Sequence, residues 1–276
     1  MAVETEAWGY LNIFNPVCAW AAHRAVLVSA PATGGFVSVW AASLFARTDR
    51  SRADREILIE TARRQHFPTR ISRLTGMYCF TDLESAERAL SWGSPRNHFR
   101  KEFIAEYSLA EAVKAEKVDA NWITGSSTLN DQEWPRHYWS GEPFPGQAPI
   151  WETLVTGRLI ILGTAIRERS RDLIERRFPK SVVLAETARM AAYVGSDLGN
   201  ACGFLFDEGK NVSLKYLCDM REAGDPELQK KLVDLRDSGG VVATPAFIES
   251  LKIGAFHTPD FRPFEYTRPK GSMPLI

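Results

Sequence analysis

The sequence has no excess of charge of either sign. Its 34 lysine and arginine residues are balanced by 34 aspartate and glutamate residues, so the formal net charge at pH 7 is zero. A chain without net charge has no overall field that would draw it to nucleic acid or to anionic lipid. Any polyanion would therefore have to be bound by a local patch of cationic side chains.

Cysteine is also scarce. The four cysteines, Cys18, Cys79, Cys202 and Cys218, include no close pair and no two-residue spacing next to histidine of the kind found in zinc sites. Cys79 stands in a strand-like pattern and Cys18 lies beside Trp20, so both are expected to be buried rather than nucleophilic. The pattern predicts reduced thiols and no metal.

Long apolar runs are missing. No segment approaches the ~18 uninterrupted apolar residues that would indicate a membrane-spanning helix. The amino terminus begins with the acidic Glu4 and Glu6 instead of the basic segment of a secretory signal. We therefore expect a cytoplasmic protein without a membrane partner.

The sequence motifs of common hydrolases are absent as well. There is no G-x-S-x-G motif of a serine hydrolase and no G-x-x-x-x-G-K motif of a phosphate-binding loop. Acidic clusters with metal-ligand spacing are also lacking. These absences favour a transferase that uses few cofactors.

What the sequence does contain is a large apolar core and two parts of different character. Apolar residues make up 45% of the 276 residues and aromatic residues 11%, enough for a folded protein of one large domain or two small ones. Residues 1–165 mix strand and helix patterns, which predicts an α+β domain. Residues 166–276 are expected to be mainly helical, with an extended tail from Thr258.

Hydrophobic periodicity and turn residues give the expected elements of both parts. Strands are expected at Trp8–Phe14, Ile71–Phe80 and Phe103–Tyr107, a further one is compatible with Asn121–Thr124, and Trp151–Thr164 is expected to form two strands around Thr156 and Gly157. Helices are expected at Asp49–Gln65, Leu83–Leu90 after a capping box of Thr81 and Glu84, Ile166–Arg177, Val182–Val194 and Pro226–Asp237, with a short helical turn at Leu109–Lys117. Residues 16–30 fit a helix or a helix followed by a strand at 26–28, residues 36–46 fit either structure, and residues 131–149 are expected to form an ordered aromatic loop.

The strongest local signal lies in Arg70–Leu90. There a strand carrying Ser72, Arg73, Gly76 and Tyr78 runs into a capped helix. Such a strand could serve a dinucleotide: the arginine could pair with a phosphate, the glycine allows close backbone approach, and the tyrosine could stack on nicotinamide or adenine. The alternative is that Tyr78 belongs to the core and Arg73 is a solvated edge charge.

A second signal is Glu152, which begins an apolar strand directly after the aromatic loop. A carboxylate in that place would be partly desolvated, and such acids often have a function. It could hold a ribose hydroxyl and stabilise positive charge that develops on the sugar. The alternative is a carboxylate that faces solvent at a strand edge.

Two weaker candidates are cationic or aromatic. The arginine-rich helix at 47–64, together with Arg70, Arg73, Arg96 and Arg100, could form a basic surface for RNA or DNA phosphates, although most such helices are simply solvated. His137 and Tyr138, beside Arg136, could orient a substrate or act as acid and base, although packing is the more common role.

The order of these segments resembles a known enzyme family. The strand SRLTGMYCF, the helix ESAERAL, the strand EFIAEY and the acid-bearing strand WETLVTGRL look like the small bacterial ADP-ribosyltransferase-like families, including those of toxin–antitoxin and phage-defence systems. Gly76, Tyr78, Phe80 and Ser85-Ala86 are more distantly similar to the G-x-Y-F and S-x-x-A pattern of the poly-ADP-ribose polymerases. The resemblance covers residues 1–165.

The resemblance implies a split mixed β-sheet with NAD in the cleft between its halves and no metal. It implies that Glu152 and Tyr78 are catalytic and that Ser72, Arg73 and Gly76 line the NAD site. The family commonly has His or Arg on its first strand, whereas WGYLNIFNP offers Tyr10, Asn12 and Asn15. We take Asn12 as the first-strand contact to NAD, with His23 as an alternative.

Taken together, the resemblance implies a mono-ADP-ribosyltransferase that moves ADP-ribose from NAD to a macromolecular acceptor. The arginine-rich helix favours nucleic acid over protein as that acceptor. A toxin or phage-defence effector, with an antitoxin or defence-complex partner, would fit the family. The alternative is a non-catalytic module of the same fold that binds a nucleotide or a partner protein.

Overall fold

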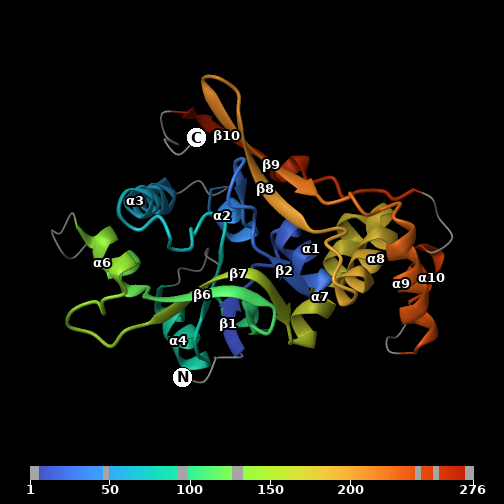
Figure 1. The fold of residues 1–276 in the computed structure, drawn as a ribbon, viewed down its shortest axis with the longest axis horizontal. Helices are drawn as coiled ribbons and strands as arrows, with labels where there is room; N and C mark the ends of the chain where they lie inside the picture. Colours follow the sequence, from blue (N-terminus) through green and yellow to red (C-terminus); the bar gives the residue numbers. More distant parts are fainter. Residues whose placement is uncertain are drawn as a thin grey trace.

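The computed structural model describes residues 6–45, 50–92, 99–125, 133–239, 244–250 and 255–270. Its fold is α+β, with two sheets flanked by helices (Figure 1). Every strand pairing in these residues is antiparallel. The expectation of a mixed sheet is therefore wrong for the described part of the chain, because each strand runs opposite to every strand with which it pairs.

The larger sheet belongs to the amino-terminal part. Its strands are β1 (Glu6–Tyr10), β2 (Val26–Val28), β4 (Met77–Phe80), β5 (Ile104–Ser108), β6 (Ala112–Asp119) and β7 (Trp151–Ile161). They follow the order β2-β7-β4-β1-β5, and β6 also pairs with β7. Because β5 pairs with the end of β7 as well as with β1, the strands β7, β4, β1 and β5 close into a ring.

Strand β7 is one continuous strand of 11 residues, which corrects the expectation of two strands around Thr156 and Gly157. Gly157 has φ +103°, and a Cβ at this position would lie 2.7 Å from the carbonyl oxygen of Glu111 and 2.7 Å from the amide nitrogen of Val113. The glycine thus permits a close approach of β6 within a strand rather than a chain reversal.

Helices pack around this sheet. They are α1 (Pro16–Arg24), α2 (Val39–Phe45), α3 (Arg50–His66), α4 (Leu83–Arg88), α5 (Asn121–Gly125) and α6 (Trp134–Ser140). Asn15 caps α1 by accepting a hydrogen bond from the amide of Val17, and β2 follows α1 directly, so residues 16–30 contain both a helix and a strand. Helix α4 is capped by Asp82, which accepts from the amide of Ser85 at 2.6 Å, and not by the expected box of Thr81 and Glu84.

Three further expectations were wrong because long-range packing outweighed the local pattern. The expected helical turn at Leu109–Lys117 is the strand β6, which gains its hydrogen bonds from β7. Asn121–Thr124 is helical in α5 rather than extended. The aromatic loop contains the helix α6, whose Trp139 is buried and donates its indole N–H to the carbonyl oxygen of Ile59 at 2.8 Å.

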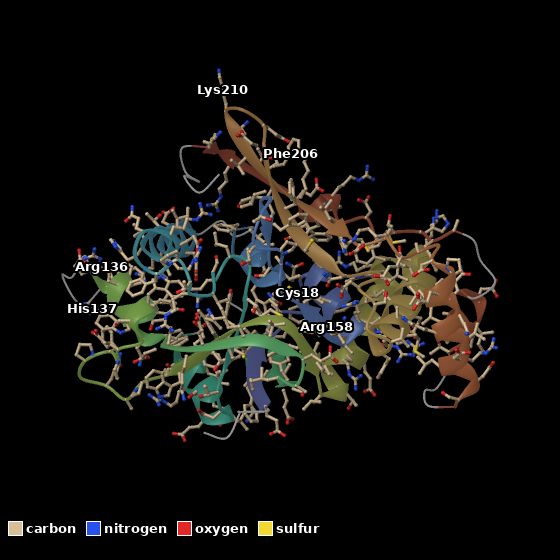
Figure 2. The ribbon with its side chains drawn as sticks, in the orientation of Figure 1. Cys18, Arg136, His137, Arg158, Phe206 and Lys210 are labelled. Carbon is tan, nitrogen blue, oxygen red and sulfur yellow. The ribbon has the colours of Figure 1, made fainter. Side chains whose placement is uncertain are left out.

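The carboxy-terminal part contains the expected helices and a second sheet that the sequence did not reveal. The helices α7 (Thr164–Arg177), α8 (Val182–Tyr193) and α9 (Pro226–Asp237) confirm the periodicity, and α10 (Pro245–Ser250) follows them. The second sheet has the order β10-β9-β8-β3, with β3 (Phe36–Val37), β8 (Ala201–Asp207), β9 (Asn211–Cys218) and β10 (Tyr266–Pro269). The β8–β9 hairpin projects from the body, with Phe206 and Lys210 toward its tip (Figure 2).

The two parts are joined by packing. Strand β3 of the first part pairs with β8 of the second, and α1 packs against both α7 and α8. One cluster of buried apolar side chains contains residues of both parts. The domain boundary at residue 165 stays a prediction.

The described helices and the cysteines bear on two simple expectations. None of these helices combines the length and apolar character that crossing a membrane would require. All four cysteines are free thiols, and the predicted burial of Cys18 and Cys79 is confirmed.

Candidate functional site

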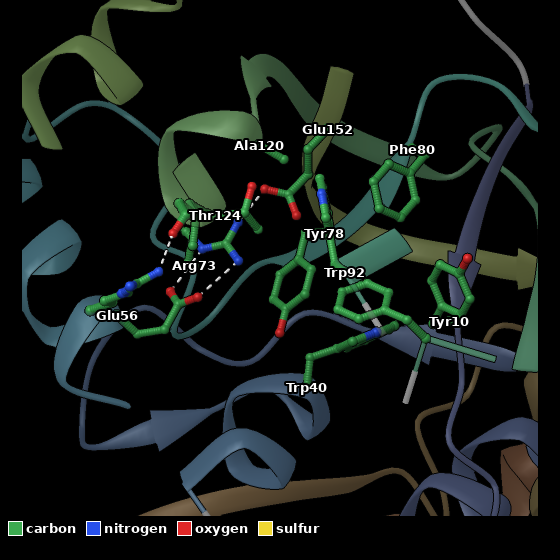
Figure 3. A pocket seen from close by; sticks show the side chains of 13 residues that line it. Tyr10, Trp40, Glu56, Arg73, Tyr78, Phe80, Trp92, Ala120, Thr124 and Glu152 are labelled. Atoms are coloured by element: carbon green, nitrogen blue, oxygen red, sulfur yellow. Dashed lines mark hydrogen bonds and ion pairs between the residues drawn. The ribbon is translucent and has the colours of Figure 1, made fainter. Parts of the chain in front are cut away.

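A cavity of about 340 Å³ lies beside β4 and β7, and we refer to it as the first cavity (Figure 3). Its volume is within the range of sites that bind small organic ligands. One wall is aromatic and the other is polar. The lining side chains include Tyr10, Trp40, Tyr78, Phe80, Trp92 and Phe99 on the aromatic side, and Arg55, Glu56, Arg73, Thr124 and Glu152 on the polar side.

The sheet register explains why Tyr78, Phe80 and Glu152 share this cavity. Phe80 of β4 lies opposite Glu152 of β7, and Tyr78 lies opposite Leu154. Directly paired residues, and residues two apart on one strand, point to the same face of a sheet. Glu152 is only 5% exposed, so the alternative of a solvent-facing carboxylate is wrong.

The polar wall is organised around a buried arginine. Arg73 donates from Nε and Nη2 to the carboxylate of Glu56 at 2.8 and 2.9 Å. From Nη1 it donates to Oε2 of Glu152 and, at 2.9 Å, to the hydroxyl of Tyr138. The alternative of Arg73 as a solvated edge charge is wrong, because its side chain is enclosed by two carboxylates and a tyrosine.

These contacts decide the charges of the cluster. Burial alone would lower the pKa of Arg73, but the carboxylates of Glu152 and Glu56 raise it well above its ordinary value. Burial raises the pKa of Glu152 above 4.5, Arg73 opposes this effect, and Glu56 adds to it. Burial also raises the pKa of Tyr138, which therefore acts as a neutral hydroxyl donor to Oε2 of Glu152 at 3.1 Å.

The two oxygens of Glu152 have different surroundings. Oε2 accepts hydrogen bonds from Arg73 and from Tyr138. Oε1 accepts none from the residues that the structure describes, and the carboxylate borders the first cavity. The protein thus fixes the orientation of the group through one oxygen and leaves the other to a ligand.

The aromatic wall is built from edge-to-face and tilted pairs. Tyr10 lies edge-on to Phe80 and Phe99, with ring centroids 6.1 and 5.0 Å apart. The ring centroids of Tyr78 and Trp40 are 6.1 Å apart, and the guanidinium carbon of Arg73 is 4.4 Å from the ring centroid of Tyr78. Such a wall suits a flat, partly charged ring, which can stack on aromatic faces.

Three of the six predicted site residues meet in this cavity: Arg73, Tyr78 and Glu152. The other three do not line it. Ser72 donates its hydroxyl to Glu60 at 2.8 Å, and Asn12 accepts from the amide of Phe14 in a local turn. A Cβ on Gly76 would lie 2.6 Å from a methyl group of Ile71, so this glycine serves close packing.

The structure also brings in residues that sequence reasoning missed. Tyr10, rather than Asn12, is the first-strand side chain in the cavity, and its hydroxyl donates to the carbonyl oxygen of Ala86 at 2.6 Å. Burial raises the pKa of Tyr10 to about 12. Glu56 and Tyr138 were missed as partners of Arg73, because no local pattern distinguishes them from their neighbours.

Other candidates have structural roles. His137 lies at the outer surface with Arg136 (Figure 2). Its ring stacks on that of Trp122 with centroids 5.0 Å apart, and its Nδ1 lies 2.9 Å from Oε2 of Glu142. His23 is buried, does not line the first cavity and pairs with Glu186 at 3.2 Å. No group of histidine, cysteine or acidic side chains suited to a metal ion occurs within the described ranges.

Within the described residues, the basic surface expected around the arginine-rich helix is formed only in part. Arg73 is buried. The guanidinium carbon of Arg100 lies 5.5 and 5.3 Å from the ring centroids of Phe14 and Phe103. Arg55 donates to the carbonyl oxygen of Ile123 at 2.7 Å. Arg47 and Arg96, and the side chains of Arg50 and Arg52, lie outside the described residues.

Comparisons with known proteins give one finding. A family described as a protein of unknown function (DUF2441) matches residues 37–169. This region contains α3, β4 and β7, and so holds Glu56, Arg73, Tyr78, Tyr138 and Glu152. None of the curated proteins compared with the chain matches it.

Proposed function

We propose that this protein is a mono-ADP-ribosyltransferase with an ADP-ribosyltransferase type of fold. NAD would bind in the first cavity, and ADP-ribose would pass to a macromolecular acceptor, with nucleic acid favoured over protein. The observation that carries the proposal is the buried Glu152, held through Oε2 and offering Oε1 to an aromatic-walled cavity.

In the proposed reaction, Oε1 of Glu152 accepts a hydrogen bond from a hydroxyl of the nicotinamide ribose. The bond between ribose C1′ and the nicotinamide nitrogen breaks, and its electron pair leaves with nicotinamide. The negative charge of Glu152 stabilises the positive charge that develops on the sugar. A nucleophile of the acceptor then forms a bond to C1′ and loses its proton to solvent.

The aromatic wall would hold the nicotinamide ring. Tyr78 lies between Trp40 and the Arg73 side of the cavity, so a ring stacked on it would place the ribose toward Glu152. Tyr10 would occupy the place of the His or Arg that the resembling family has on its first strand. Its hydroxyl is committed to Ala86, so its contribution would be packing.

The role first expected for Arg73 needs revision. Four of its five guanidinium N–H groups already donate to Glu56, Glu152 and Tyr138, which leaves one on Nη2 for a phosphate. Arg73 would instead orient Glu152 and keep it ionised. Arg55 also lines the cavity and, among the described residues, donates from Nη1 to the carbonyl oxygen of Ile123, so it is better placed to receive a phosphate of NAD.

The wider expectations are part of the same proposal. The protein would act in the cytoplasm as a toxin or phage-defence effector, with an antitoxin or defence-complex partner. The carboxy-terminal part would serve as a lid, as an acceptor-recognition unit or as an assembly surface.

The test is incubation of the purified protein with labelled NAD and separate pools of RNA, DNA and cell protein. We expect label on one pool together with release of nicotinamide. Glu152→Gln should reduce both by at least about 100-fold, because a neutral amide cannot stabilise the developing charge. Glu175→Gln is the matched control, since Glu175 is an exposed glutamate on α7 whose ion-pair partner among the described residues is Arg171, at 2.9 Å.

A second function has its own support. Glu152 is already engaged by Arg73, and the first strand offers Tyr10 where the resembling family has His or Arg. Both features would suit a non-catalytic module that binds a nucleotide or a partner protein. In that case folded wild-type protein would release no nicotinamide and label no pool. NAD or a related nucleotide would still bind, and Glu152→Gln would leave its affinity nearly unchanged.

A further inference from the structure

A second cavity, of about 750 Å³, adjoins the first along α3 and β7. Helix α3 contributes Glu56 to the first cavity and Glu60, one turn later, to the second. Strand β7 likewise contributes Glu152 to one and Thr156 to the other. The second cavity is lined by residues 32–37, the end of α3, residues 68–72, Leu74, Thr75, Lys114, Thr156 and Leu205.

The walls of the second cavity are cationic in a protein whose net charge is zero. Arg63, Arg64, Arg70 and Lys114 line it, against one carboxylate, that of Glu60, which leaves three positive charges in excess. Including Glu116, which pairs with Lys114 at 2.6 Å, still leaves two. Such a local excess is the footprint of a site for phosphates.

The buried Glu60 fixes part of this cationic wall. Its carboxylate accepts from Arg63 at 2.8 and 2.9 Å and from Arg64 at 3.0 Å. Burial alone would raise the pKa of Glu60, but hydrogen bonds from Arg63 and Ser72 hold it below 4.5, so the carboxylate remains charged. One carboxylate therefore holds two guanidinium groups in place.

Arg70 is not among the cations that Glu60 holds. Arg70 is half-buried, and its side chain makes no hydrogen bond or ion pair with the residues that the structure describes. The side chains of Arg64 and Lys114 are 53% and 46% exposed. An arginine that is partly removed from water without an anionic partner is suited to receive one from a ligand.

An aromatic ring completes the wall. Phe36 of β3 lines the cavity and lies edge-on to Phe204, with ring centroids 5.1 Å apart. Proteins that bind single-stranded nucleic acid combine a cationic groove along the backbone with aromatic side chains on which bases stack. The cations come from α3, from the turn after it and from β6.

We propose that the second cavity binds the phosphate backbone of a single-stranded nucleic acid, which is the acceptor for the ADP-ribose group. As an acceptor site it rests on the transferase proposal. The binding itself does not, because it can be measured without NAD.

The experiment measures binding of a fluorescently labelled oligouridylate by anisotropy over a series of salt concentrations. The test variant replaces Arg64, Arg70 and Lys114 by Gln. We expect binding at least about tenfold weaker at low salt, and a slope of log affinity against log salt that is shallower by about 0.7 for each lost phosphate contact. Arg176→Gln on α7 is the matched control, since Arg176 is an exposed arginine that lines neither cavity, and this variant should bind as the wild type does.

The triple variant also loses a hydrogen bond of the fold, because Lys114 donates to the carbonyl oxygen of Thr69 at 2.6 Å. A single variant at Arg70 therefore provides a second test that does not depend on this bond. Arg70→Gln breaks no contact in the described residues and should still weaken binding severalfold. Oligouridylate that fails to bind at low salt, or that binds all variants equally, would overturn the proposal. Displacement by NAD or by polyglutamate as readily as by unlabelled oligouridylate would overturn it too, in favour of a nucleotide or an acidic protein.

The two proposals can fail separately. Weakened binding in the variants without any release of nicotinamide would support the nucleic-acid site and contradict the transferase. Release of nicotinamide and labelling of protein, with no binding of oligouridylate, would support the transferase and overturn the nucleic-acid site.

Discussion

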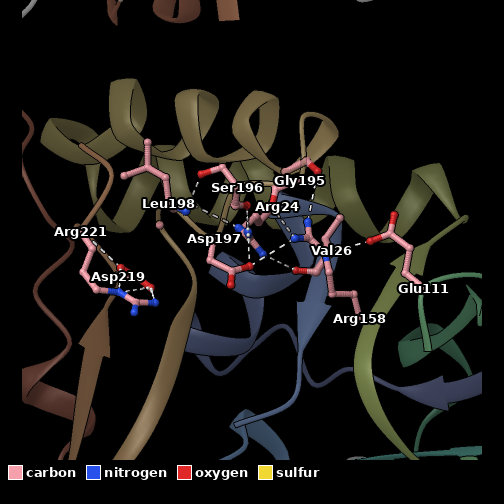
Figure 4. A network of polar contacts seen from close by, with 12 residues as sticks. Arg24, Val26, Glu111, Arg158, Gly195, Ser196, Asp197, Leu198, Asp219 and Arg221 are labelled. Carbon is pink, nitrogen blue, oxygen red and sulfur yellow. Dashed lines mark hydrogen bonds and ion pairs between the residues drawn. The ribbon is translucent and has the colours of Figure 1, made fainter. Parts of the chain in front are cut away.

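Two fully buried arginines of this protein can be compared directly. Arg73 and Arg24 are 5% and 1% exposed, and both lie among elements that are distant in sequence. Arg24 donates to the carbonyl oxygens of Leu198, Val26 and Ser196 at 3.2, 2.9 and 2.6 Å (Figure 4). Arg73 donates to two carboxylates and a tyrosine hydroxyl.

The partners give the two arginines opposite electrostatics. Burial lowers the pKa of Arg24 to about 10, and the partly exposed Asp197 opposes this only in part. Carboxylates raise the pKa of Arg73 in spite of burial. Backbone carbonyls are held by the fold whatever the side chain does, so Arg24 ties α1 to the 196–198 turn. Arg73 instead holds the carboxylates of Glu56 and Glu152, which line the first cavity.

The largest expected effect comes from Arg73→Met. It leaves Glu56 and Glu152 buried without a cation, which should cost about 3–5 kcal/mol of unfolding free energy near neutral pH. The pKa of Glu152, which burial already raises, would then rise further because Arg73 no longer opposes the effect of burial. The stability of the variant should therefore be highest at acid pH and fall as pH rises through the raised pKa of Glu152. Urea unfolding at several pH values measures this, and nicotinamide release should drop about 100-fold.

An Arg73→Met variant as stable as the wild type at neutral pH would contradict the ion-pair account of this cluster. A destabilisation that does not change with pH would do the same. The variant would then have lost packing and not charge compensation.

Arg24→Met sharpens the comparison with a smaller effect. It leaves carbonyl oxygens unsatisfied, so we expect a loss of about 2–3 kcal/mol. That loss should be nearly independent of pH, because the main partners do not titrate. Nicotinamide release per folded molecule should stay close to that of the wild type. A folded Arg24→Met protein that releases no nicotinamide would show that the two arginines do not divide into scaffold and site.

The smallest effect is the pH dependence of the unaltered protein. Glu152 has to be ionised to stabilise the sugar cation, and burial raises its pKa above 4.5. Nicotinamide release should therefore rise with pH, about tenfold for each unit below that pKa, and then level off. Initial rates in a series of buffers measure the midpoint. A midpoint below the ordinary glutamate value would contradict the assignment to Glu152.

Part of the site followed from the sequence, and part did not. The sequence points to Tyr78 because it shares an expected strand with Arg73 and Gly76, and to Glu152 because it begins an apolar strand. The sequence does not say which first-strand side chain faces the cavity, so it favours Asn12, whereas Tyr10 is the first-strand residue that lines the cavity. The binding roles expected for Ser72 and Gly76 follow from their closeness to Arg73 in sequence, but Ser72 donates its hydroxyl to Glu60 and Gly76 serves close packing against Ile71.

The errors in secondary structure have the same origin. Residues 109–117 have a weak helical pattern, yet they form β6 because β7 supplies hydrogen bonds along its whole length. The strands β8 and β9 were missed because their stability depends on each other and on β3. Helices, whose hydrogen bonds are local, were the elements most often placed correctly.

The sequence by itself determined the α+β composition, the positions of most helices and the presence of an arginine, a tyrosine and a glutamate suited to one site. Only the tertiary structure decided that these three meet, that Glu56 and Tyr138 complete the cluster, and that one oxygen of Glu152 is left to the cavity. The reason is physical. Helix periodicity and capping act over a few residues, whereas burial, ion pairing and strand pairing depend on groups that only folding brings together.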